Sequence, residues 1–214
     1  MMVGALIVVA SLAISAFAYQ RVIVPAGGME PTLSRGDRLS VRNVSGDQVR
    51  RGDVIVFSAT AWDGDYDLVK RVVGVGGDTI ECCEAKYRIV VNGRGITEEY
   101  IGTGEGEHPN WKYTAKVEQG QVWVLGDNRG NSRDSRNEIA GPTRGGVPVG
   151  DIKGIVVRSG GNDIRTTAFI RAGLAGEPFK DELDKWTYVL LGVGGVLFVG
   201  GIGWLLVAVR RRGA

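Results

Sequence analysis

Two uncharged apolar segments, one near each end of the chain, place the strongest limit on how it can fold. Residues 1–18 carry no charged side chain, and as a helix rising 1.5 Å per residue they would measure about 27 Å, just enough to cross the hydrocarbon core of a bilayer. Residues 187–209 form a second uncharged run of 23 residues, with aromatic side chains near its ends. We therefore expect an N-terminal anchor over residues 1–20 and a C-terminal transmembrane helix over residues 187–209.

The basic residues after the second apolar segment predict an orientation. Arg210, Arg211 and Arg212 close the chain within a short tail over residues 210–214, and positive charge favours the cytoplasmic side. Two spans would then put both termini in the cytoplasm of a cell-membrane protein and the middle of the chain outside. A cleaved secretory signal is the alternative for the first segment, because residues 16–18 read Ala-Phe-Ala; its start lacks the basic residues that such signals carry.

The middle of the chain has a β pattern. Short runs rich in Val and Ile recur at residues 38–41, 54–57, 68–75, 87–91, 121–125 and 155–157. Between them Gly-Asp returns at residues 36–37, 46–47, 52–53, 77–78, 126–127 and 150–151, where glycine can supply positive φ and aspartate can bond its own backbone. Frequent turns between short strands predict a mostly β domain over residues 21–160, built as a coiled antiparallel sheet or barrel. Residues 161–186 are expected to be a juxtamembrane connector.

Composition excludes several kinds of site. A net charge of +2 without a basic stripe argues against nucleic acid as a partner. The single histidine, His108, lies in a polar excursion over residues 102–110 and is expected to be a solvated loop residue. Cys82 and Cys83 are adjacent and cannot by themselves hold tetrahedral zinc; we expect an unbridged pair, with a vicinal disulfide or a bond to another chain as alternatives. We expect no metal and no cofactor.

Lys70 is the candidate for acid–base chemistry. It interrupts the β-branched run of residues 68–73, where burial would disfavour its charged form and make it a general base. Taken alone, a surface lysine is the more ordinary interpretation. A loop over residues 126–136 adds a hydroxyl at Ser132 and an expected ion pair between Asp134 and Arg136.

A further segment, residues 25–33, lies just beyond the first apolar run. Pro25 and Pro31 bracket it, and Gly27 and Gly28 let its backbone adopt conformations that other residues resist. It is therefore expected to be a shaped loop near the membrane surface.

The order of these segments resembles that of bacterial type I signal peptidases. The resemblance runs from residue 24 to residue 157, and its motifs stand at residues 27–33, 51–57, 70–74, 77–80, 91–93 and 126–136. It implies a membrane-anchored Ser/Lys endopeptidase, with a mostly β catalytic domain against the outer membrane face. It also implies as partners the lipid bilayer and exported preproteins cut after a small-x-small sequence, with the translocation machinery as a further candidate.

The resemblance assigns roles to individual residues. Lys70 matches the general base, Ser132 the hydroxyl that orients it, and Met29 the residue after the nucleophile. The supporting positions are matched by Gly126, Asp127, Asn128, Arg129, Asp134 and Arg136.

Two positions depart from the family pattern. Gly28 stands where the nucleophilic serine belongs, and Ala26 stands where many members keep a hydroxyl that helps to bind the oxyanion. Glycine has no oxygen with which to form an acyl-enzyme, and losing a nucleophile typically costs on the order of 10⁶ in kcat. The sequence therefore predicts an inactive or severely impaired member of the family.

Other interpretations remain open at this stage. The chain can be a non-cleaving protein that binds signal peptides or a partner peptidase. It can also be an inactivating variant of an enzyme that carries serine at position 28, since sequence does not separate natural loss from an introduced change. Residual activity through Thr32, or through a water activated by Lys70, is a third alternative.

Overall fold

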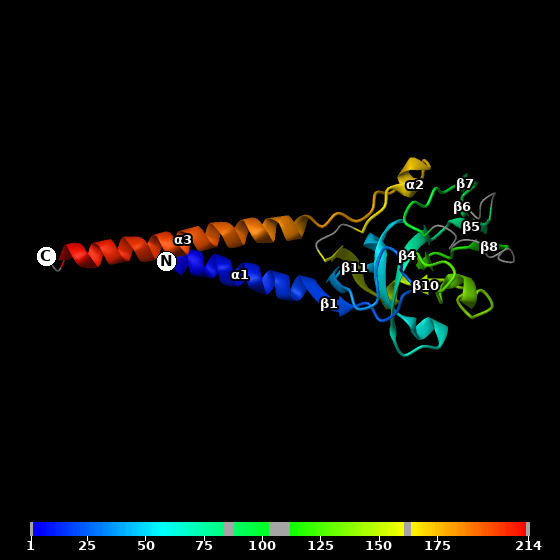
Figure 1. The fold of residues 1–214 in the computed structure, drawn as a ribbon, viewed down its shortest axis with the longest axis horizontal. Helices are drawn as coiled ribbons and strands as arrows, with labels where there is room; N and C mark the ends of the chain where they lie inside the picture. The colour runs from blue at the N-terminus through cyan, green and yellow to red at the C-terminus, as the bar shows by residue number, and fades with distance from the viewer. Residues whose placement is uncertain (1, 84–87, 103–111, 161–163, 213–214) are drawn as a thin grey trace. The chain divides into compact units, whose positions relative to one another are not determined.

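The computed structural model describes residues 2–83, 88–102, 112–160 and 164–212, with side chains outside the description at Asp184 and at residues 205–212. His108 and most of its polar excursion therefore lie outside the described residues. The chain divides into two compact units, one of Arg21–Phe179 and the other of Met1–Gln20 with Lys180–Ala214. Figure 1 shows the helices and strands of each unit.

The larger unit is built on a seven-stranded sheet in the order β1-β2-β11-β3-β4-β9-β10. Its strands are β1 (Tyr19–Ile23), β2 (Arg38–Arg42), β3 (Val54–Ser58), β4 (Asp67–Val75), β9 (Gln121–Leu125), β10 (Val147–Pro148) and β11 (Ile152–Ser159). The pairings from β2 to β10 are antiparallel. Register shifts in β4 and β11 interrupt the ladders, and such irregularities bend and twist a strand.

A smaller sheet in the order β7-β6-β5-β8 joins the same unit (Figure 1). It consists of β5 (Thr79–Cys82), β6 (Val90–Val91), β7 (Arg94–Gly95) and β8 (Tyr113–Lys116). Among the described residues, short 3-10 helices lie at Gly46–Gln48, Ala59–Trp62, Ser135–Glu138 and Val149–Asp151. A single turn of α-helix, α2, covers Ala168–Arg171.

Strand β4 is buried on both faces, and this burial positions the site. Val69 packs into one apolar cluster with residues of β2 and β3, while Val72 packs into another with residues of β3 and β9. Between these valines stand Lys70 and Arg71, which are 5% and 1% exposed. A strand with so much apolar surface can keep two cations buried only if each has suitable partners.

The predicted mostly β, coiled antiparallel sheet is confirmed, with two qualifications. The strand order ends at β1 and β10, so among the described residues the sheet is open and not a closed barrel. Of the glycines in the six Gly-Asp dipeptides, Gly36, Gly52 and Gly77 have positive φ and the other three do not. The prediction that glycine supplies positive φ at these turns is therefore wrong for those other three.

The smaller unit contains two helices, α1 (Met2–Ala18) and α3 (Glu182–Arg212). Within α3, Lys185–Trp204 is long and apolar enough to cross a membrane, whereas α1 is a shorter apolar helix. α3 begins at Glu182, five residues before the expected start of the span. The helices lie side by side, with the Gly4 carbonyl 3.1 Å from the Cβ position of Gly194.

The expectation of an unbridged cysteine pair was wrong. The structure joins Cys82 and Cys83 by a disulfide at the end of β5, the alternative that the sequence left open. Adjacency prevents such a bond from closing a loop, but it does not prevent the two sulfurs from meeting.

Candidate active site

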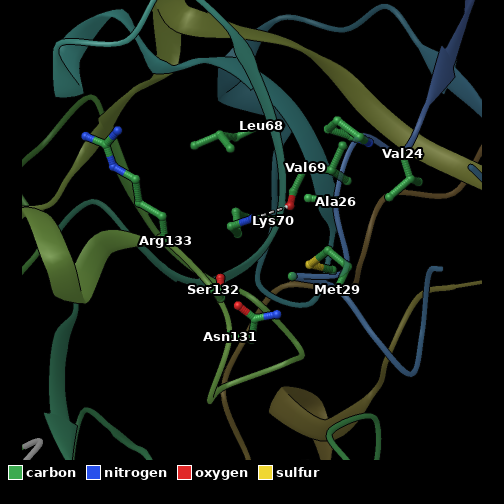
Figure 2. A pocket seen from close by; sticks show the side chains of 11 residues that line it. Val24, Ala26, Met29, Leu68, Val69, Lys70, Asn131, Ser132 and Arg133 are labelled. Atoms are coloured by element: carbon green, nitrogen blue, oxygen red, sulfur yellow. Dashed lines mark hydrogen bonds between the residues drawn. The ribbon is translucent and has the colours of Figure 1, made fainter. Parts of the chain in front are cut away.

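Lys70 reaches the site from the middle of β4. Its Nζ donates a hydrogen bond of 3.0 Å to the carbonyl oxygen of Val69, the residue before it (Figure 2). Burial lowers the pKa of Lys70 below its ordinary value, and the nearby carboxylates Asp134 and Asp127 oppose this in part. The interpretation of Lys70 as a surface lysine is therefore wrong.

Gly28 and Ser132 lie close to the side-chain amine of Lys70. A Cβ added at Gly28 would lie 3.3 Å from Lys70 Nζ and 3.7 Å from Ser132 Oγ, which are ordinary or slightly tight contacts. Figure 2 shows the Ser132 hydroxyl pointing toward Lys70. This hydroxyl oxygen is buried and has no hydrogen-bond partner within the described part of the chain. The backbone at Gly28 does not have the positive φ that would exclude a side chain.

A cavity of about 220 Å³ opens beside these groups. Its lining comes from the loop before β2, from β4 and from the loop after β9, and comprises Val24, Pro25, Ala26, Gly28, Met29, Leu68, Val69, Lys70, Asn131, Ser132 and Arg133. Most of these side chains are apolar, so an amine at the cavity wall is poorly solvated. The cavity suits a small apolar group next to a base.

Backbone contacts hold the Gly28 segment against the loop after β9. Asn128 donates its backbone N–H to the Gly28 carbonyl at 3.2 Å and its side-chain amide to the Gly27 carbonyl at 3.1 Å. An added Cβ at Gly126 would collide with Ser132 Oγ and with the Gly28 carbonyl oxygen. Gly126 is therefore required for close approach of the two segments.

Asp134 and Arg136 form the expected ion pair, with 2.7 Å between Arg136 Nη2 and Asp134 Oδ2. The Gly126 N–H also donates to the Asp134 carboxylate at 3.0 Å, and Arg136 donates to the Arg129 carbonyl at 3.0 Å. Asp134 thereby closes the loop that carries Ser132 onto the end of β9.

Arg71, next to Lys70, forms a second buried pair. Its guanidinium donates to both oxygens of Asp127, with the shortest contact at 2.7 Å, and to the carbonyl oxygens of Gly52 and Ile164. The Thr32 hydroxyl donates to Asp127 at 2.6 Å. Thr32 is therefore committed to this network, which counts against it as a replacement nucleophile.

Glu98 and Tyr100 belong to the same network, and no sequence pattern indicates either of them. Glu98 receives two hydrogen bonds from the Arg129 guanidinium and one from the Tyr100 hydroxyl. The Arg71 guanidinium lies 4.2 Å from the centroid of the Tyr100 ring. Glu98 and its partner Arg129 are 31 positions apart in the sequence, so their contact becomes visible only in the folded chain.

The predicted residues thus fall into two groups. Those that line the cavity are Ala26, Gly28, Met29, Lys70 and Ser132. Those that hold the loop after β9 without lining the cavity are Gly126, Asp127, Asn128, Arg129, Asp134 and Arg136. The first group can bind and deprotonate a small reactant; the second fixes the distance between the base and Ser132. Among the described residues no group of three or more His, Cys, Asp and Glu side chains could hold a metal ion.

Comparison with known proteins finds a matching family model and similar proteins. The family model described as signal peptidase, peptidase S26, matches residues 1–159. Signal peptidase I of Bacillus licheniformis is 34% identical over 143 residues, covering 62% of this chain and 74% of that protein. Probable signal peptidase I-1 of Synechocystis sp. is 40% identical over 124 residues, covering 52% of this chain and 59% of that protein.

One similar solved structure is a signal peptidase I from Enterococcus faecalis V583. It is 26% identical, with a TM-score of 0.41, and the match covers 50% of this chain and 95% of that chain. Because the family model matches well over half of the sequence, the chain belongs to the signal peptidase family, peptidase S26.

Proposed function

We propose that this chain is a signal peptidase I-type protein in which Lys70 is the general base and Ser132 orients it, but in which preprotein cleavage is severely impaired at Gly28. The observation that carries the proposal is the 3.3 Å between Lys70 Nζ and the Cβ position of Gly28. A serine oxygen one bond further out has room to reach hydrogen-bond distance of the amine.

The surroundings of Lys70 support its role as a base. A lysine that titrates near 10.4 is a poor base at neutral pH, and burial against apolar side chains brings its pKa toward the working range. The Ser132 hydroxyl, with its free hydrogen-bonding capacity, is suited to receive an N–H of that amine and to fix its direction. Both groups belong to the chain as it stands.

The substrate class follows from the family and from the cavity. Exported preproteins cut after a small-x-small sequence would place a small side chain against Ala26, Met29 and Leu68. Ala26 offers no side-chain hydroxyl to an oxyanion, so the site would have to stabilise this charge through other donors.

The proposal also includes a place in the cell. The apolar helix Lys185–Trp204 and the shorter helix α1 support two membrane spans, and the arginines of residues 210–212 support a cytoplasmic C-terminus. The β unit would then be extracytoplasmic, where preproteins emerge. The bilayer and the translocation machinery are the further partners that we propose.

The test is to add the missing oxygen. Gly28→Ser is expected to cleave a preprotein in detergent or lipid at a rate several orders of magnitude above that of the parent chain. The reason is that the new nucleophile would lie beside an existing base. Cleavage is measured by the appearance of the mature N-terminus, and Lys70→Met in the same background should remove it.

Gly28→Ala is the matched control, because it adds the Cβ without the oxygen and should stay inactive toward preprotein. A folded Gly28→Ser variant that cleaves nothing would contradict the proposal of a preserved site. Robust preprotein cleavage by the parent chain would contradict the proposed impairment.

A further inference from the structure

Three polar atoms converge on the Cβ position of Gly28. Lys70 Nζ lies 3.3 Å from that point, the Asn131 carbonyl oxygen 3.4 Å and Ser132 Oγ 3.7 Å. The carbonyl is an acceptor, the hydroxyl can donate or accept, and an uncharged amine can do both. The point lies on the wall of the cavity of about 220 Å³.

These surroundings fit a water molecule better than an apolar group. A bound water needs about 10–15 Å³ and typically two to four polar partners. A water oxygen cannot stand on the Cβ position itself, which is one bond from the Gly28 Cα, but beyond that position, in the cavity, it would have these three polar atoms as neighbours. The Ser132 oxygen is buried without a partner in the described residues, which favours a ligand that can hydrogen-bond to it. A methyl group at the Cβ position would fill the space that such a water needs and would hydrogen-bond to none of the three.

We propose that Gly28 makes room for a nucleophilic water between Lys70, Asn131 and Ser132, and that the chain thereby hydrolyses activated esters of small apolar acids without a covalent intermediate. The inference rests on the proposed function in using the same base and cavity. It differs in the nucleophile, which is solvent instead of a side chain.

The chemical step balances with these groups alone. The water oxygen bonds to the ester carbonyl carbon while one of its protons passes to the free amine of Lys70. The tetrahedral intermediate then expels the alkoxide or phenolate, which takes the proton back from the Lys70 ammonium or from solvent. The products are one carboxylic acid and one alcohol, and the lysine returns to its free form.

Esters are favoured over peptides because of the leaving group. A phenolate leaves without prior protonation, whereas an amine must be protonated as it departs, and water is a weaker nucleophile here than a positioned serine. The acyl group should be small and apolar because Val24, Met29 and Leu68 line the cavity.

The experiment follows p-nitrophenyl butyrate hydrolysis by the full chain in detergent. We expect repeated turnover without a burst, and Lys70→Met should lower the rate about 100-fold, as for loss of a general base. The rate should rise with pH to a midpoint below 10.5, because burial lowers the pKa of Lys70. Gly28→Ser should instead show a burst of nitrophenolate as an acyl-enzyme accumulates.

Gly28→Ala is the decisive variant, because its methyl group would exclude the water from the space beside Gly28 while leaving Lys70 in place. We expect its rate to fall to that of Lys70→Met, with an unchanged melting temperature showing that the variant is folded. Ser132→Ala is a second variant that keeps the room at Gly28 but removes one partner of the water, and it should slow turnover severalfold.

Three results would overturn the inference. They are equal rates for the parent chain and Lys70→Met, full activity in a folded Gly28→Ala, and a stable butyryl group on Lys70 detected by mass spectrometry. The last would show that the amine itself is the nucleophile. None of them bears on preprotein cleavage by Gly28→Ser, so failure of this inference and failure of the proposed function can be told apart.

Discussion

Asp53 shows how a single buried carboxylate ties stability to pH. It accepts the N–H groups of Arg50 and Phe179, each at 2.8 Å, and is fully buried. Burial raises its pKa to about 6, although those hydrogen bonds and the charges of Arg50 and Arg165 lower it. The folded protein therefore holds this proton more tightly than the unfolded chain does, between about pH 4 and pH 6.

The sign of the effect follows from proton binding. Where the folded state binds more protons, the free energy of unfolding falls as pH rises, so Asp53 should reduce stability by about 3 kcal/mol between pH 4 and pH 7. In Asp53→Asn this part of the decline should disappear. Chemical unfolding in detergent, followed by tryptophan fluorescence at several pH values, measures how steeply the free energy of unfolding falls with pH. This slope is compared, and not the stability at one pH, because the asparagine amide also changes the hydrogen bonds. Parallel plots of unfolding free energy against pH for the parent chain and Asp53→Asn would contradict the assignment.

At the scale of elements, the loop after β9 is held to the body by buried ion pairs more than by apolar contacts. Arg71 and Asp127 join it to β4, and Glu98 and Arg129 join it to the segment that precedes β8. In each of these two pairs both side chains are at most 4% exposed. Removing one member of such a pair leaves its partner charged and without compensation.

Glu98→Gln should therefore destabilise the β unit by about 3–5 kcal/mol, because Arg129 would stay buried without its counter-charge. Its neighbour provides the control: Glu99 pairs with Arg171 at the surface, where the side chains are 66% and 49% exposed. Glu99→Gln should change stability by at most about 1 kcal/mol. The comparison uses the midpoints of denaturant unfolding, and equal effects of the two substitutions would show that the Glu98 pair does not stabilise the loop.

At the scale of the whole molecule, the proposed topology makes a labelling prediction. Ser45 is exposed on the β unit, and Arg212 ends α3. With Cys82 and Cys83 changed to serine, Ser45→Cys should react with a membrane-impermeant maleimide in intact cells, whereas Arg212→Cys should react only after lysis. Labelling of both, or of Arg212→Cys alone, in intact cells would contradict two spans with a cytoplasmic C-terminus.

The parts of the fold and site that the sequence predicts are those with a local pattern. The β-branched runs predict β2, β3, β4, β9 and β11, and the order of motifs places Lys70, Ser132 and Gly28 in one site. Asp134 and Arg136, two residues apart, could be paired from the sequence alone.

Interactions that depend on distant partners could not be predicted in this way. Glu98 stands in an ordinary polar stretch, and only the folded chain brings Arg129 to it. Likewise, nothing local indicates that Gly126 is required for close packing against the Gly28 carbonyl, or that two glycines lie where α1 and α3 meet. The open ends of the sheet also depend on which strands pair, which strand patterns do not specify.

The two hydrogen bonds from Asn128 to the carbonyls of Gly27 and Gly28 have a consequence for how such a protein evolves. They hold the segment through its main chain, so its position does not depend on the side chain at 28. Selection for folding alone preserves this geometry whether or not the protein cuts anything. The loss of the nucleophile that we propose would then be reversible, because a lineage that retains this loop would remain one substitution away from a serine at position 28.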